Sequence, residues 1–191
     1  MPDRSRTRDL SEVPDPDLLA RIAQGELGAL GVLYDRYERD VRRVVARLAS
    51  SSADIDDVVQ NTFLEVLRAA AGYDGRPNAR PWLIGLGVTQ IRRDRRSVSR
   101  LAARLAAWAR EPASPPTSPE ESAVTSARAA RLRRAFEALS TKKREVVVLV
   151  TLEGLSGEEV ARVLDVPVAT VWTRLHHARK ELSHAMSQEE S

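Results

Sequence analysis

Cysteine is absent from the 191-residue sequence, which excludes disulfide bridges and metal sites built on thiolate ligands. The chain also has no apolar run close to the roughly 20 residues that a helix needs to cross a bilayer. Its first residues, MPDRSRTRDLSEVPDPD, hold no hydrophobic segment like that of a secretory signal peptide. From these absences we expect a soluble, cytoplasmic protein that is not inserted in a membrane.

Aromatic residues are scarce as well, at 4% of the chain, and the alternating β-branched pattern of strands is almost missing. Alanine, leucine, arginine and glutamate dominate instead, which is typical of helices. A hydrophobic content of 42% is enough for a buried core in one domain or in two small ones. The expected fold class is therefore all-α.

The net charge is only +3, but the charged residues are unevenly distributed. Residues 14–90 carry a net charge of −2, residues 91–110 one of +6, and residues 126–186 one of +4. The net charge argues only weakly for a nucleic-acid partner, but a basic band between an acidic and a basic lobe indicates that different surfaces meet different partners.

A stretch rich in proline and serine, REPASPPTSPEES at 110–122, interrupts the helical pattern. It predicts a flexible linker between two small helical domains, with a long ordered loop as the alternative. We place a disordered tail at 1–13, a first domain at 14–97, a basic helix extension and linker at 98–125, and a second domain at 126–187.

Apolar residues spaced three or four apart predict four helices in the first domain. The first has Asp15 as its cap and Pro16 in its first turn, and it stops at Gly25. The third begins near Asp54, and the fourth starts at Pro81 or Trp82 after the loop GYDGRPNARP. The residues expected to be buried are Leu27, Leu30, Leu33, Tyr34, Tyr37, Val41, Val44, Val45 and Leu48 on the second helix, Ile55, Val58, Val59, Thr62, Phe63, Val66, Leu67 and Ala70 on the third, and Trp82, Leu83, Leu86 and Ile91 on the fourth.

The second domain shows two capping boxes, Ser118 to Glu121 and Ser156 to Glu159, each of which predicts the start of a helix. A short helix within STKKREVVVLVTLEG is expected between them, ending at Gly154. The second box opens a short helix that the turn LDVP joins to a longer basic one, and this arrangement predicts a helix-turn-helix motif. The residues expected to be buried are Val124, Leu132, Ala135, Phe136, Leu139, Val160, Ala161, Val163 and Leu164.

The last helix, within VPVATVWTRLHHAR, has two distinct faces. One face is apolar and holds Val171, Leu175, Ala178 and Leu182. The opposite face holds Ala169, Thr173, His176, His177 and Lys180, with Thr170 and Trp172 on the flanks. Small threonines near its amino end suit a helix that enters the major groove. On this segment alone, an ordinary amphipathic helix with a solvated polar face is the alternative.

Residues that could carry catalysis are not arranged for it. His176, His177 and His184 lack the HExxH spacing of a metal site, and Asp56 and Asp57 are neighbours in sequence instead of a pair across a cleft. Neither a glycine-rich phosphate loop nor a Ser/His/Asp constellation is visible. We expect no enzymatic activity, no catalytic residue, no metal and no cofactor.

The whole succession of segments resembles a known family. LLARIAQGELGALGVLYDRY, DIDDVVQNTFLEVLRAAAGYD, RPWLIGLG, the linker, and ALSTKKREVVVLVTLEGLSGEEVARVLDVPVATVWTRLHHARKEL are together similar to bacterial RNA polymerase sigma factors of the extracytoplasmic-function class. The resemblance covers roughly residues 15–186. It implies a region 2 domain that binds core RNA polymerase and melts the minus-ten element, a region 4 domain that recognises the minus-thirty-five element, and an anti-sigma partner.

The resemblance assigns the core-binding role to the polar face of the third helix, where one leucine stands among polar residues. The family docks this face on a coiled coil of the largest polymerase subunits. The residues concerned are Asp56, Asp57, Gln60, Asn61 and Leu64. Taken without the resemblance, they describe a solvated face with one stray leucine.

The resemblance also assigns two DNA surfaces. The one for the minus-ten element comprises Tyr73, Asn78, Arg80, Thr89, Arg92, Arg93 and Arg96, whose arginines can neutralise phosphates or form a solvated run. Trp82 shares a face with Leu86, so we give it a structural role. The surface for the minus-thirty-five element comprises Thr170, Trp172, Thr173, Arg174, His176, His177 and Arg179.

Four residues depart from the family pattern. Thr89 and Arg93 stand where the family usually has an asparagine, followed four residues later by an aspartate or asparagine. Trp172 and His177 stand where it usually has cations, and at Trp172 we expect apolar contact, such as with a thymine methyl group. One alternative function is that of an independent helix-turn-helix regulator. The other is that of a sigma-like adaptor that cannot open promoters, which the threonine at position 89, in place of the usual asparagine, supports.

Overall fold

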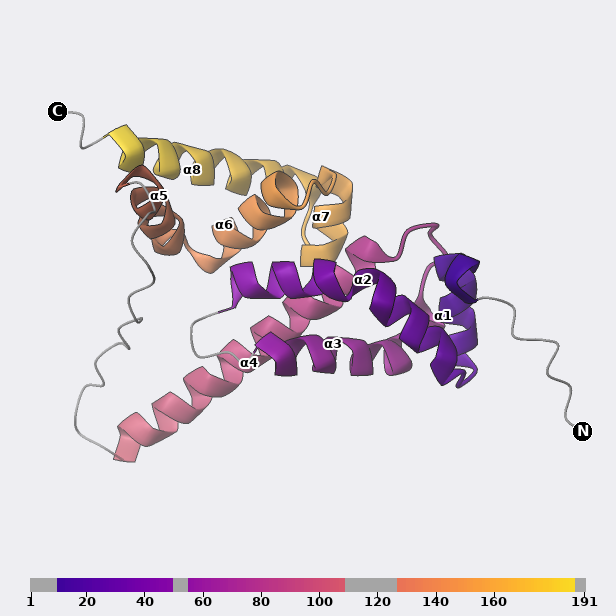
Figure 1. Ribbon diagram of the computed structural model, residues 1–191. Coiled ribbons are helices and arrows are strands. Elements are labelled where there is room, and N and C mark those ends of the chain that lie inside the picture. Colours follow the sequence, from indigo (N-terminus) through magenta and orange to yellow (C-terminus); the bar gives the residue numbers. More distant parts are fainter. Residues whose placement is uncertain (1–9, 50–54, 109–126, 188–191) are drawn as a thin grey trace, which may run out of the picture. The chain divides into compact units, whose positions relative to one another are not determined.

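The computed structural model describes residues 10–49, 55–108 and 127–187 (Figure 1). Every regular element in these ranges is a helix, which confirms the expected all-α class. The chain divides into two compact units, Met1–Arg93 and Asp94–Ser191. Most of the predicted linker lies outside the described residues, as does the capping box that begins at Ser118.

The first unit is built on long helices that pack around a common core. Its elements are η1 (Leu10–Glu12), α1 (Asp15–Ala23), α2 (Leu27–Leu48), α3 (Ile55–Ala69), η2 (Ala70–Gly72) and the first part of α4 (Arg80–Trp108). The largest fully buried side chains are Leu18, Leu19, Leu33, Val41, Val44, Val45, Val58, Val59, Leu83 and Ile84. Seven of these residues, on α2, on α3 and at Leu83, were expected to be buried from their three-to-four spacing, whereas Leu18, Leu19 and Ile84 were not among the expected core residues.

Gly87 lets α4 approach the other helices closely. A Cβ built on this residue would stand 3.5 Å from Cγ1 of Val41 on α2 and 3.7 Å from Oγ1 of Thr62 on α3. The Thr62 hydroxyl is itself buried and donates a hydrogen bond to the carbonyl oxygen of Val58. A larger side chain at Gly87 would therefore press on two helices at once.

Some residues that the periodicity assigns to the core are not buried. Leu27, Tyr34, Leu67 and Leu132 are exposed. On α4 the buried side runs through Leu83, Ile84, Gly87, Val88 and Ile91, whereas Trp82 and Leu86 are only half-buried. The apolar stripes are wider than the strip that each helix buries, so the residues at their edges remain at the surface.

The predicted capping role of Asp15 is wrong. The N-cap residue of α1 is Pro14, and the side chain of Asp15 turns inward, where it is only 3% exposed. Its carboxylate accepts hydrogen bonds from the guanidinium of Arg36, the hydroxyl of Tyr37 at 2.5 Å, and the backbone N–H of Ala79 at 2.8 Å. A buried carboxylate is tolerated only when it is paired in this way.

The partners of Asp15 connect three parts of the first unit. Arg36 also donates to the carbonyl oxygens of Ser11 at 2.8 Å and Val13 at 3.1 Å, which holds the segment before α1. Burial, followed by the hydrogen bond to Asp15, raises the pKa of the Tyr37 hydroxyl, which therefore stays protonated to a higher pH than that of a free tyrosine. One carboxylate thus joins α1 to α2 and to the residue that precedes α4.

The second unit consists of short helices packed on one long helix. Its elements, apart from the end of α4, are α5 (Ala127–Ala138), α6 (Thr141–Val146), the π-helical segment η3 (Val147–Leu152), α7 (Gly157–Leu164) and α8 (Val168–Ser187). Each of α5, α6 and α7 contacts α8. The buried residues include Leu139, Val146, Val148, Leu149, Leu155, Val160, Leu164, Val171, Leu175 and Ala178.

The predicted helix-turn-helix is present in α7 and α8. Ser156 accepts a hydrogen bond from the backbone N–H of Glu159, whose carboxylate accepts one from the N–H of Ser156, so the capping box is confirmed. Asp165 adopts a left-handed conformation with φ of 54°, which aspartate tolerates better than most residues. The turn is thereby short enough to place α8 directly against α7.

Replacing Asp15 with asparagine should destabilise the first unit by about 2 kcal/mol or more, because it removes the charge that compensates Arg36 in a largely buried site. Tyr37→Phe removes one hydrogen bond and should cost about 1 kcal/mol. Urea denaturation followed by circular dichroism measures both free energies of unfolding. Equal stabilities for Asp15→Asn and the wild type would contradict the role given to this carboxylate.

Candidate binding surfaces

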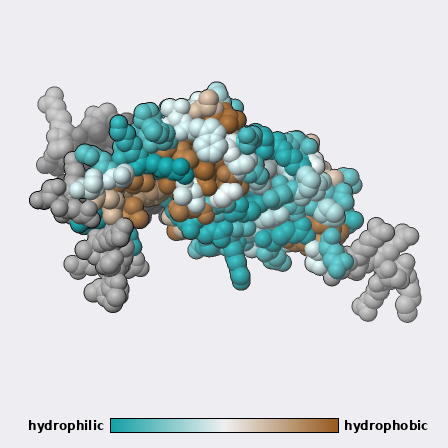
Figure 2. All heavy atoms as spheres, turned by 90° about the horizontal axis from the view of Figure 1, so that it is seen from above, coloured by the Kyte–Doolittle hydropathy of each residue, from teal (hydrophilic) through white to brown (hydrophobic). Residues whose placement is uncertain are grey.

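Hydrophobic residues reach the surface in patches among hydrophilic ones, as the face in Figure 2 shows. Among the described residues the large exposed apolar side chains are Leu27, Tyr34, Leu64, Leu67, Leu132, Leu152 and Trp172. Contiguous exposed apolar groups often mark a surface that another molecule covers. Tyr34 and Leu64 line the same groove.

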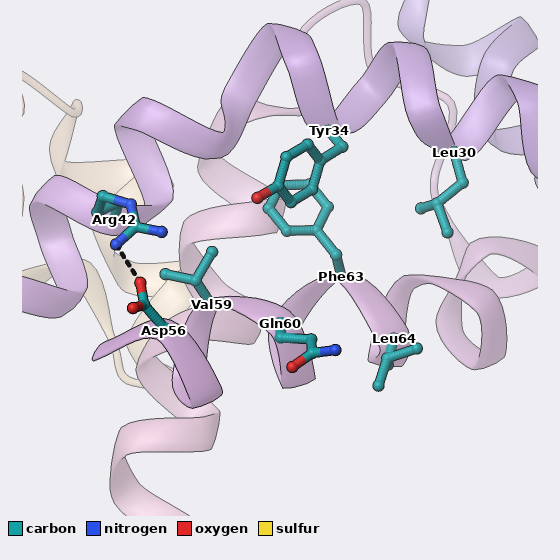
Figure 3. A pocket seen from close by; sticks show the side chains of 8 residues that line it. All are labelled: Leu30, Tyr34, Arg42, Asp56, Val59, Gln60, Phe63 and Leu64. Atoms are coloured by element: carbon teal, nitrogen blue, oxygen red, sulfur yellow. Dashed lines mark hydrogen bonds and ion pairs between the residues drawn. The ribbon is translucent and has the colours of Figure 1, made fainter. Parts of the chain in front are cut away.

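This groove lies between α2 and α3 and has a volume of about 450 Å³. Tyr34 on α2 and Phe63 on α3 face each other in its middle, with ring centroids 4.7 Å apart (Figure 3). Leu30 and Leu64 lie toward one end, and Leu64 is 50% exposed. The groove therefore has an apolar floor with one leucine raised at its edge.

The other end of the groove is charged. Arg42 on α2 pairs with Glu38 on its own helix and with Asp56 on α3. Hydrogen bonds to Glu38 and then to Asp56 raise the pKa of the Arg42 guanidinium. Asp56 is exposed, so this pair is accessible to a partner as well as to water.

All five residues predicted to bind polymerase lie exposed on α3. Asp56, Gln60 and Leu64 line the groove, whereas Asp57 and Asn61 are exposed outside it. The sequence did not indicate the α2 side of the groove. Leu30 and Tyr34 belong to an apolar stripe that we assigned to the core, and only the packing of α3 on α2 shows that they border a surface.

The loop between η2 and α4 is held by internal hydrogen bonds. The hydroxyl of Tyr73 donates to the carbonyl oxygen of Arg76 at 2.8 Å, and the Tyr73 ring meets Trp82 edge-on, with centroids 5.1 Å apart. Burial, with smaller contributions from Asp74 and Asp15, raises the pKa of Tyr73 to about 12. Trp82 is half-buried, so it is not the core residue that its face, shared with Leu86, predicted; its ring contacts Tyr73 instead.

Asn78, a predicted DNA residue, also has a structural contact. Its side-chain oxygen accepts a hydrogen bond from the backbone N–H of Arg80, the first residue of α4, at 2.9 Å. The neighbouring N–H, that of Ala79, bonds to Asp15. The start of α4 is thus held by Asn78 and Asp15 together.

The other predicted minus-ten residues lie on or at the start of α4. Arg80 lies 3.4 Å from Asp40, and Arg93 lies 3.6 Å from Glu65. The hydroxyl of Thr89 donates to the carbonyl oxygen of Gly85 at 2.9 Å. The spacing of Thr89, Arg92, Arg93 and Arg96 places them on one side of the helix.

Helix α8 has the two faces that the sequence predicted. Val171, Leu175 and Ala178 are buried, whereas Leu182 is half-buried. The exposed side holds Thr173, His176, His177 and Arg179, with Thr170 and Arg174 half-buried beside it. The Thr173 hydroxyl donates to the carbonyl oxygen of Ala169, and the rings of His176 and His177 lie 5.7 Å apart.

Trp172 has a contact that the sequence did not reveal. Its indole lies against Gly157, the first residue of α7, so closely that a Cβ on Gly157 would stand 2.7 Å from Cζ2 of the ring. The residue is nevertheless 49% exposed. One part of the indole therefore belongs to the contact between α7 and α8, and another part belongs to the surface.

Across the residues that the structure describes, no group of three histidine, aspartate or glutamate residues is placed to hold a metal ion. Within the same residues, no helix has the length and apolar character needed to cross a membrane.

Two family models match the chain. Sigma-70 region 2 matches residues 33–101, and Sigma-70, region 4 matches residues 129–182. The first match includes most of α2, all of α3 and most of α4, and the second contains α7 and most of α8.

Relatives and solved structures agree with these matches. The ECF RNA polymerase sigma-E factor of Escherichia coli is 28% identical over 181 residues, which cover 91% of this chain and 94% of that protein. The structure of CnrH in complex with the cytosolic domain of CnrY is 29% identical, with a TM-score of 0.64, and covers 92% of this chain and 98% of that one. The match to the sigma factor RpoE in complex with the anti-sigma factor NepR, from Bartonella quintana, covers 80% of this chain and 92% of that one, with a TM-score of 0.61. At 20% identity, it shows a likeness in fold alone.

Replacing Asn78 with alanine should lower the stability of the first unit by about 0.5 to 1 kcal/mol, because the first N–H of α4 loses its acceptor at an exposed site. Asn78→Ser is the matched control, since serine accepts a hydrogen bond from a nearby N–H and should retain most of the stability. Chemical denaturation measures both. If the alanine and serine variants are equally stable, the side chain of Asn78 does not hold the helix.

Proposed function

Because this chain belongs to the sigma-70 family, in its extracytoplasmic-function class, we propose that it binds core RNA polymerase at the α2–α3 groove and recognises promoters through two DNA surfaces. A role in transcription initiation follows from the family itself. The proposal concerns which residues of this chain carry each step.

The single observation that supports core binding best is the groove between α2 and α3. Its floor is aromatic, at Tyr34 and Phe63, and its rim carries the half-exposed Leu64. A helix of a partner protein buries this kind of surface, with apolar anchors in the middle and polar groups at the rim. Gln60 and Asp56 supply such polar groups along the same helix.

We assign contact with the minus-ten element to the loop that begins at Tyr73 and to one side of α4. This side carries positive charge along successive turns of the helix, and it is formed by Thr89, Arg92, Arg93 and Arg96. The pair between Arg93 and Glu65 is exposed on the arginine side, and such pairs contribute little to stability, so a phosphate can compete for the arginine. Each phosphate contact adds about one unit to the salt dependence of binding.

We assign recognition of the minus-thirty-five element to α8. Its exposed side carries Thr173, His176 and His177, which lie near the amino-terminal half of the helix, the part that enters the major groove in helix-turn-helix proteins. We assign phosphate contacts on either side of this row to Thr170, Arg174 and Arg179.

We further propose an anti-sigma partner. A solved chain of the same fold is in complex with the anti-sigma factor NepR, and CnrH is in complex with the cytosolic domain of CnrY. A protein of this kind would compete with core polymerase if it covers the groove between α2 and α3.

Transcription from double-stranded promoters tests the function as a whole. Start sites mapped after overexpression supply the promoters, and the purified chain with core polymerase should produce start-site-specific transcripts from them. Tight binding to core without any such transcript would favour the adaptor. Binding to duplex DNA with no affinity for core would favour the independent regulator.

Leu64→Asp should weaken binding to core polymerase at least about tenfold, because it places a charge where a partner buries an apolar side chain. Leu67→Asp is the matched control: Leu67 lies on the same helix and is 37% exposed, but it does not line the groove. Affinity is measured by fluorescence anisotropy and helicity by circular dichroism. The groove is excluded as the core-binding surface if both variants bind core equally well.

A further inference from the structure

Gly157 has no conformational reason to be glycine. It is the first residue of α7, and its φ is not positive. Glycine is less favourable than alanine within a helix. The residue is buried, and the atoms nearest to its missing Cβ all belong to Trp172.

The distances explain why glycine stands there. A Cβ on Gly157 would lie 2.7 Å from Cζ2, 2.9 Å from Cε2 and 3.1 Å from Nε1 of the Trp172 ring. Carbon atoms in contact stay about 3.5 to 4.0 Å apart, so the present position of the indole and any side chain at 157 are incompatible. The two positions are therefore coupled through space.

The site under the indole is rigid. Ser156, the residue before Gly157, caps α7, and the reciprocal bond from its N–H to Glu159 fixes the first turn of the helix. Tryptophan is itself stiff, with two side-chain torsions and a large flat ring. A rigid ring on a rigid helix start restricts how α8 can turn relative to α7.

Trp172 also adjoins the exposed row of α8. Thr173 follows it directly, and His176 lies one turn further along the helix. Any movement of the indole away from Gly157 would therefore change how this row is presented. The exposed half of the indole lies on the flank of the row instead of at its centre.

We propose that Trp172 is a positioning residue: its indole, resting on Gly157, sets the orientation of α8 relative to α7 and so determines how the exposed row meets DNA. This inference rests on the proposed recognition of the minus-thirty-five element by α8. It replaces the expected contact between the indole and a thymine methyl group with a contact inside the motif.

Stability measurements on the full chain test the contact without DNA. Gly157→Ala should lower the melting temperature of the second unit by about 3 °C, because the new Cβ displaces the indole. In the Trp172→Lys background the same substitution should raise the melting temperature, since alanine favours the helix and nothing obstructs it. This reversal of sign is the signature of the coupling.

Fluorescence reports the position of the indole directly. Trp172 is the only tryptophan left when Trp82 and Trp108 are replaced by phenylalanine. In that background Gly157→Ala should shift the emission to longer wavelength and increase quenching by acrylamide, because the indole moves into water. An unchanged spectrum together with an unchanged melting temperature overturns the proposal.

Promoter selection by the holoenzyme tests the functional consequence. With a library randomised in the upstream element, Gly157→Ala should weaken the preference at least about fivefold and at all base pairs together. Trp172→Phe, which retains an aromatic ring over Gly157, should keep most of the preference. A residue that contacts a base would instead relax specificity at its own position.

The outcomes separate this inference from the function on which it rests. If the wild type shows an upstream preference that Gly157→Ala leaves unchanged while Trp172→Phe alters one base pair, Trp172 recognises a base and the positioning role is wrong. If the wild-type holoenzyme shows no upstream preference, the proposed role of α8 fails and the inference fails with it.

Discussion

A carboxylate that is removed from water must receive hydrogen bonds and a compensating charge from its surroundings, and Asp15 receives them from α2 and from the residue before α4. Arg36 supplies the charge, Tyr37 a hydroxyl donor and Ala79 a backbone N–H. These groups can meet the carboxylate only when α1, α2 and the start of α4 are correctly placed together. The first unit therefore has one polar interaction that fails if any of its parts is displaced, in addition to its close-packed apolar core.

The contacts of Asp15 lie on a different part of α2 from the residues that line the groove between α2 and α3. Arg36 and Tyr37 on α2 bind Asp15, while Tyr34 and Arg42 on that helix face α3 across the groove. The loop before α4 ends at Ala79, whose N–H bonds to Asp15, and Asn78 beside it satisfies the first N–H of α4. One long helix thus supports the proposed core-binding groove with some of its residues and the proposed minus-ten loop with others.

In the second unit the corresponding constraint is steric. The capping box fixes the start of α7, the left-handed Asp165 makes the turn short, and Trp172 occupies the space over Gly157. Trp172 and His177 on α8 are the two positions of this helix at which the sequence departs from the cations that we expected from the family. In the proposed recognition of the minus-thirty-five element, the orientation of α8 relative to α7 decides which base pairs its exposed row meets.

Patterns in the amino-acid sequence were enough to predict the helical class, the two-domain organisation, the helix-turn-helix with its capping box, and the polar face of α3 with its single leucine. Each of these depends on residue spacing, on a helix cap or on the composition of a linker, which a short stretch of chain specifies. Packing of the helices was needed to reveal the inward turn of Asp15, the α2 side of the groove at Leu30 and Tyr34, and the contact of Trp172 with Gly157. These features arise between residues far apart in sequence, or at the edges of apolar stripes, where periodicity cannot distinguish a core position from a surface one.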